Sequence, residues 1–132
     1  MIRVRNIAHP VIRQFILRTA VVNYLGKCLQ QQWEDWQNQR MHLRTLHLDN
    51  VETALATAKN DETGQEVLSQ LIEILRLKVH ASRNLLQREY EELFTYMMDK
   101  RELWDSPEYF KAKSALSTAN HHLRIYATSV VT

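Results

Sequence analysis

The sequence predicts an all-α fold, in which a long antiparallel helical hairpin is thickened to a three- or four-helix bundle by a C-terminal helix. Two observations support this prediction. The 132 residues include only two glycines and two prolines, which is too few for the many tight turns of a sandwich, barrel or propeller. Apolar residues also recur at intervals of three, four and seven along most of the chain, the spacing of helices that bury one face.

The predicted organisation is a basic N-terminal arm, residues 1–9, followed by one helical domain, residues 10–132. The residue before a proline avoids the helical region, while Pro10 itself suits a first helical turn. No acidic residue precedes Glu34, whereas residues 89–108 hold seven acids against two bases. Antiparallel packing would bring these segments together, so we expect Arg13 and Arg18 to lie near acids such as Glu92.

The first helix is predicted over residues 10–48, with a second interpretation in which it runs on to residue 59. Its apolar seam, the row of residues expected to face the core, has a strict interval of seven residues: Phe15, Val22, Leu29, Trp36 and Leu43. Near residue 48 the apolar phase shifts, and Asp49 with Glu52 resembles a capping box. No glycine or proline forces a break there, so the sequence favours a continuous or kinked helix.

Two further helices are predicted over residues 64–105 and 107–130. The stretch 60–64 is rich in turn-forming residues, and Thr63 with Glu66 forms a capping box that predicts a helix start. Ser106 followed by Pro107 is a typical N-cap and first helical position. The middle helix carries a seam at seven-residue spacing and a second apolar stripe, which predicts cover on two sides: Leu71, Ile74, Leu77, Ala81 and Leu85.

At its thin end such a hairpin has only two helices, which leaves the apolar seam partly open. Exposed apolar stripes usually mark an interface. We therefore expect a non-catalytic protein–protein interaction module, such as an adaptor, a chaperone-like cofactor, a small regulator or a subunit of an assembly. Its expected partners are another protein and a second copy of itself. The predicted contact residues are Trp33, Trp36, Leu43, Leu46 and Leu48.

The two tryptophans have two interpretations. In the first, Trp36 continues the seam of the first helix and Trp33 covers its edge. In the second, the pair anchors a partner, because aromatic residues within polar surroundings are typical interface hot spots. All the other residues of the stretch 30–39 are polar.

The alternative function is a nucleic-acid-binding regulator, in which Arg3, Arg5, Arg13 and Arg18 contact phosphates. Against it, Arg13 and Arg18 have acidic neighbours in the predicted bundle. A weaker alternative is peripheral membrane attachment through the first helix. The longest uncharged run in that helix, residues 19–26, is far shorter than the roughly 20 residues of a membrane span, so no span is expected.

The sequence predicts no enzyme, no cofactor and no metal site. Two glycines cannot build a phosphate-binding loop, and no histidine has an acid three residues before it, as a helical di-iron site requires. Cys28 is the only cysteine, which excludes an intramolecular disulfide, and its helical setting is typical of a small buried hydrophobe. A lone cysteine favours a reducing compartment or simple indifference to redox state, and we expect a cytoplasmic protein.

Overall fold

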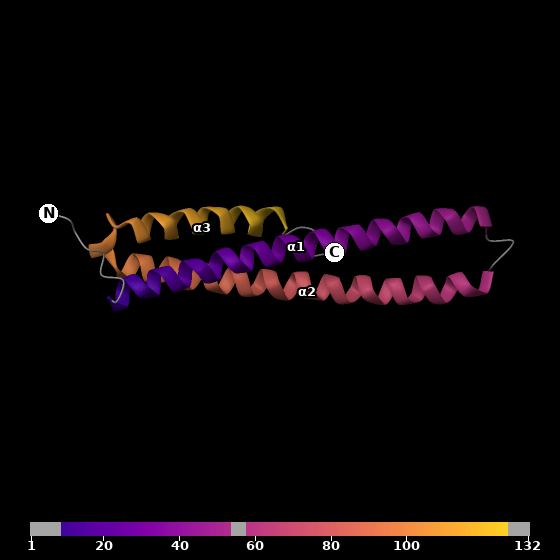
Figure 1. Ribbon diagram of the computed structural model, residues 1–132, viewed down its shortest axis with the longest axis horizontal. Helices are drawn as coiled ribbons and strands as arrows, with labels where there is room; N and C mark the ends of the chain where they lie inside the picture. Colours follow the sequence, from indigo (N-terminus) through magenta and orange to yellow (C-terminus); the bar gives the residue numbers. More distant parts are fainter. Residues whose placement is uncertain (1–8, 54–57, 127–132) are drawn as a thin grey trace.

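In the computed structural model the chain forms a helical hairpin with a third helix packed along part of it. The structure describes residues 9–53 and 58–126, and side chains for residues 9–46 and 64–126. The elements are α1 (Pro10–Thr53), α2 (Ala58–Asp99), the short 3-10 helix η1 (Arg101–Leu103) and α3 (Pro107–Ile125). Figure 1 shows α1 and α2 side by side, with α3 along the half of the hairpin that holds the start of α1. The described residues contain no strand, and the predicted all-α hairpin thickened by a C-terminal helix is confirmed.

The core forms where the seven-residue seams of α1 and α2 meet beneath α3. Phe15 and Leu29 of α1 and Leu86 of α2 are 0% exposed. Burying one large apolar side chain contributes about 1.5–3 kcal/mol, so these seams supply most of the stability. The other fully enclosed members are Val22, Val79 and Leu93.

Small residues allow α3 to approach α1 closely. Ala112, Ala115 and Ala119 are buried on α3. Opposite them, a Cβ added at Gly26 of α1 would lie 3.2 Å from Cδ2 of His122. The two helices therefore meet at a position where α1 offers no side chain.

The first helix is continuous. α1 passes through Asp49 without a break and ends at Thr53, between the two ends that the sequence left open. The phase shift near residue 48 thus changes which face is apolar without interrupting the backbone. Leu48 itself lies outside the residues whose side chains are described.

The predicted start of the second helix at residue 64 is wrong. α2 begins at Ala58, so the turn-like residues 60–64 are helical. Gly64 has no positive φ, and a glycine within a helix costs only about 1 kcal/mol relative to alanine. The same residue types therefore begin a helix here rather than forming the turn before it.

The predicted end of this helix at residue 105 is also wrong, because α2 stops at Asp99. Lys100 leaves the helical region, with φ −110° and ψ 56°. The Trp104 indole Nε1 then donates a hydrogen bond to the carbonyl oxygen of Met97 at 2.9 Å. Trp104 has the spacing of a helical seam, but its ring folds back over the helix end and satisfies one of the terminal carbonyls.

The third helix begins where the sequence predicts. Oγ of Ser106 accepts a hydrogen bond from the backbone N–H of Tyr109 at 3.1 Å, and Pro107 occupies the first helical position. The helix ends at Ile125, and the Tyr126 N–H donates to the carbonyl oxygen of His122 at 3.0 Å. The rest of the predicted span to residue 130, like residues 1–8 of the basic arm, lies outside the described residues.

Replacing a seam residue should destabilise the bundle strongly. We expect Leu86→Ala to lower the free energy of unfolding by about 2–5 kcal/mol, because the vacated volume lies in a fully enclosed core. Urea denaturation followed by circular dichroism measures this change. Leu77→Ala, on the same helix at a side chain that is exposed, should change it by less than about 0.5 kcal/mol. Equal losses in both variants would contradict the assignment of the core.

Candidate partner-binding surface

The end of α3 closes the three-helix part of the molecule with a group of aromatic rings. Tyr126 packs on Trp33 with ring centroids 5.1 Å apart, and Trp33 meets Trp36 edge to face at 5.4 Å. On its other side, Tyr126 stacks with His122 at 5.7 Å and an interplanar angle of 8°. Beyond this group, toward Thr53, α1 and α2 continue as a pair without α3 (Figure 1).

The seam opens once α3 has ended. On α1, Trp36 is 4% exposed, whereas Leu43, one heptad further on, is only half-buried. On α2, Val79 is 0% exposed, whereas Ile72 is half-buried. Leu68 stays buried. Two helices alone therefore enclose their shared seam incompletely, as the sequence predicts for the thin end.

The structure places the five predicted contact residues in different surroundings. Trp36 belongs to the core, and the Arg40 guanidinium lies 4.9 Å above its ring. Trp33 is half-buried against Tyr126, so both rings fit the interpretation in which Trp36 continues the seam and Trp33 covers its edge. Leu43 and Leu46 are half-buried at the two-helix end, and Leu48 is outside the described side chains.

The predicted cover over the second stripe of the middle helix is wrong, because much of the stripe is exposed. Ile74 is 51% exposed, and Leu71 and Leu85 are exposed as well. On α1, Leu17 (55%) and Tyr24 (67%) are exposed beside Val21. Sequence spacing alone cannot distinguish a stripe that packs within the chain from one that binds a partner, since both have the period of a helix.

These exposed side chains share one side of the hairpin, away from α3. On α1 the residues that line spaces with α3 include Ile16, Thr19 and Asn23. On α2, Arg83 reaches α3 by donating to the Leu123 carbonyl oxygen at 3.5 Å. At 100° per residue the exposed stripes lie on average roughly 130° around α1 and roughly 150° around α2 from these positions. We call the stripes together the outer face: Leu17, Val21, Tyr24, Leu71, Ile74 and Leu85.

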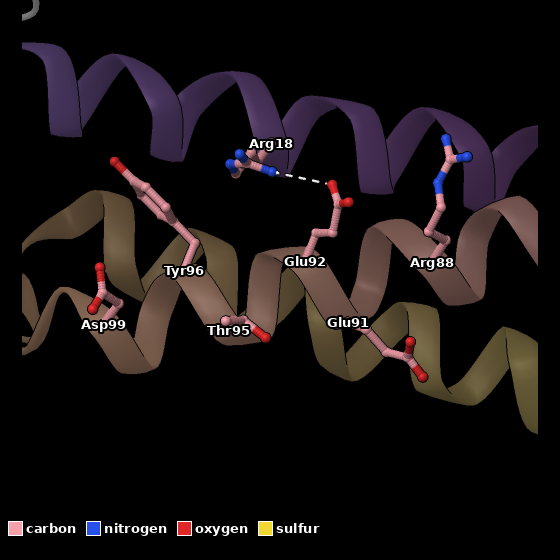
Figure 2. A pocket seen from close by; sticks show the side chains of 7 residues that line it. All are labelled: Arg18, Arg88, Glu91, Glu92, Thr95, Tyr96 and Asp99. Atoms are coloured by element: carbon pink, nitrogen blue, oxygen red, sulfur yellow. Dashed lines mark hydrogen bonds and ion pairs between the residues drawn. The ribbon is translucent and has the colours of Figure 1, made fainter.

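A polar groove of about 560 Å³ continues the outer face toward the end of α2. Figure 2 shows Glu92 extending from α2 to Arg18 of α1, with Tyr96 beside them and Asp99 further along. The Arg18 Nη1 to Glu92 Oε2 distance is 3.4 Å, and the guanidinium lies 5.2 Å from the Tyr96 ring centroid. Burial raises the pKa of Tyr96, against the opposing effect of Lys100 and Arg18. The remaining lining residues are Arg88, Glu91 and Thr95.

The predicted phosphate-binding arginines are only partly described. Arg3 and Arg5 lie outside the described residues, and Arg13 is exposed on α1. Arg18 already has an acidic partner in Glu92, which the charge distribution predicts. An exposed pair of this kind is worth about 0–1 kcal/mol, so it helps to fix the register of α1 against α2 more than it stabilises them.

Cysteine and histidine act as nucleophiles or metal ligands in many proteins, whereas Cys28 and His122 lie within the helical bundle here. Cys28 is half-buried, and its hydrogen bond with the Tyr24 hydroxyl raises the pKa of Tyr24. His122 Nδ1 is buried without a hydrogen-bond partner. Among the described side chains, those of residues 9–46 and 64–126, no three histidine, cysteine, aspartate or glutamate residues lie close enough together to hold a metal ion.

No model of a protein family matches the chain, and neither curated proteins nor solved structures show a significant match to it. Among the helices that the structure describes, none has an apolar stretch of the length needed to cross a bilayer.

The position of Trp36 in the core has a measurable consequence. We expect Trp36→Ala to reduce the free energy of unfolding by about 3–5 kcal/mol, because its ring fills the junction where α3 ends. Urea denaturation measures the loss, and Met41→Ala, at an exposed side chain of the same helix, is the matched control. If Trp36→Ala left the free energy of unfolding unchanged, the assignment of this ring to the core would be wrong.

The stability of the bundle should depend on the protonation of His122. Burial, with a smaller contribution from His121, lowers the pKa of His122. The unfolded chain therefore takes up this proton at a higher pH than the folded chain, and protonation favours unfolding. We expect stability to fall as the pH drops below about 6.5, the ordinary histidine value, and to level off below the folded-state pKa.

Denaturation midpoints at about pH 7.5 and about pH 5 measure this difference, since they lie on either side of the ordinary histidine pKa. His122→Gln should lose less stability between these two values than the unaltered chain. His42→Gln, at an exposed position of α1, should lose as much as the unaltered chain. The same loss in all three proteins would refute the assignment to His122.

Proposed function

We propose that this protein is an interaction module that binds another protein through the outer face of its hairpin. One observation supports this above the others: large apolar side chains stand exposed in stripes at helical spacing on the side of α1 and α2 that α3 leaves uncovered. Single exposed apolar residues are normal on protein surfaces. A stripe of several exposed apolar side chains along one side of a helix is typical of an interaction site.

The half-open seam at the two-helix end extends this surface. Leu43 and Leu46 of α1 and Ile72 and Leu75 of α2 are each half-buried. A partner helix lying along the hairpin would remove the exposed part of these side chains from water, as when an amphipathic helix binds in an apolar groove. Of the predicted contact residues, Leu43 and Leu46 therefore remain in the proposed surface.

Two of the arginines described at the two-helix end already make contacts within the chain. Arg76 Nη2 lies 2.6 Å from Glu73 Oε1, an ion pair within one helix. Arg40 is engaged over the Trp36 ring. Apolar contact is thus the main contribution that this surface offers, and an adaptor or a subunit of an assembly suits it best.

Binding of nucleic acid remains the alternative proposal, and peripheral membrane attachment the weaker one. For the first, a slope near zero in a salt series of DNA or RNA binding would remove it. The outer face favours a protein partner over nucleic acid, because its central residues are apolar while Arg18 already pairs with Glu92.

Replacing the apolar residues of the outer face should abolish binding of the partner. We expect Leu71→Glu/Ile74→Glu to lose a protein that the unaltered chain recovers from an extract of its own cells. The matched control is Phe110→Glu/Ile125→Glu, which replaces two apolar residues of comparable exposure on α3, on the other side. Circular dichroism checks that both variants fold.

The comparison decides the proposal through quantitative recovery of each bound protein. Loss in the outer-face variant with retention in the α3 variant supports it. Equal recovery of every bound protein with both variants would refute it.

A further inference from the structure

The occupant of the outer face that the structure supports best is a second copy of this chain. We propose that two copies pack with their outer faces together and their α2 helices antiparallel, around a twofold axis that passes beside Leu85. The proposal names one partner for the surface assigned above, and so it rests on the proposed function. Three features of the surface support it.

The first feature is charge complementarity along α2. Lys78, Leu85 and Glu92 are spaced by seven residues, close to two helical turns, so all three lie along one line of the outer face. A twofold axis beside Leu85 sets each Lys78 opposite the Glu92 of the other copy, and the contact is made twice. An axis beside Lys78 would instead bring two ammonium groups together, and repulsion between these like charges would disfavour that arrangement.

The groups involved are available for this contact. Lys78 is exposed, and none of the ion pairs between described side chains holds its ammonium. Glu92 pairs with Arg18, but its side chain is still 53% exposed. The carboxylate can therefore accept a second cation from the solvent side.

The second feature is the polar groove, which fits the part of α2 that would reach it. Its lining holds three acids, Glu91, Glu92 and Asp99, against two arginines, a net charge of −1. In the antiparallel arrangement Ile74 and Lys78 of the other copy lie over this groove. Figure 2 shows Thr95 and Tyr96 between the charged groups, where they can meet an apolar side chain while the acids meet the ammonium.

The third feature is the apolar centre. Hydrogen bonds from Arg18 to Glu92 and from Ser82 to Gln32 fix the register of α1 against α2 on either side of it. Between these two contacts lie Val21 and Tyr24 on α1 and Leu85 on α2, all exposed. An apolar centre with charged groups at its rim is the usual anatomy of a protein interface.

Charge reversal tests the pairing. We expect sedimentation velocity to show a dimer that dissociates on dilution, and Lys78→Glu to raise its Kd at least about fivefold, because two attractive pairs become repulsive. Lys113→Glu makes the same charge change on the exposed surface of α3 and should leave the Kd unchanged. Equal weakening by Lys113→Glu, or an unchanged Kd in Lys78→Glu, would overturn the pairing.

Disulfide trapping tests the axis. In a Cys28→Ser background, Leu85→Cys places one thiol of each copy beside the twofold axis, and mild oxidation should link the copies. Leu71→Cys lies on the same line of α2, two heptads away, and should not link to itself. A link from Leu71→Cys without one from Leu85→Cys would overturn the axis.

The two proposals can fail separately. A chain that stays monomeric from micromolar to millimolar concentration overturns the dimer. If Leu71→Glu/Ile74→Glu still loses a different protein, the proposed function survives that result. If no protein distinguishes the outer-face variant from the α3 variant, the proposed function fails as well.

Discussion

The length of α3 is the constraint on which the rest of the structure depends. α3 has 19 residues, against 44 in α1 and 42 in α2. At a rise of 1.5 Å per residue it covers roughly 29 Å of a hairpin that is more than twice as long. A core enclosed by three helices can exist only along that length. Leu29 and Leu86 are fully enclosed within it, and Leu43 and Ile72 are half-buried beyond it.

The aromatic group at the end of α3 marks the boundary between the enclosed three-helix core and the half-open two-helix end. Tyr126 lies between Trp33 and His122, while Trp36 beneath them completes the core. Gly26 and the alanines of α3 bring the helices close enough for these rings to meet. The two tryptophans within this polar stretch of sequence therefore lie where the three-helix core ends. The same composition also suits an anchor for a partner, which is why sequence alone could not choose between the two interpretations.

The heptad seams and the cap of α3 could be predicted because each depends on local chemistry or on a strict period. Phe15, Val22 and Leu29 had to share one face of any helix that contained them. Ser106 before Pro107 could be identified as a helix start from the hydrogen bonding of a single turn. The start of α2 could not, since acids and asparagine suit both a turn and a helix N-terminus. Trp104 had the period of a seam, but it folds back on Met97.

The outer face shows the same limit at the level of function. Leu71, Ile74 and Leu85 have the spacing of buried residues, and the sequence predicts that they are covered. Whether they are covered by the chain itself depends on where α3 lies, and α3 follows the other side of the hairpin because Gly26 and the small residues of α3 allow close contact there. The apolar residues on the opposite side of the hairpin are exposed because α3 does not lie over them. An apolar stripe that the fold leaves open, with a cation and an acid placed one heptad on either side of its central leucine, has the symmetry that a twofold contact requires.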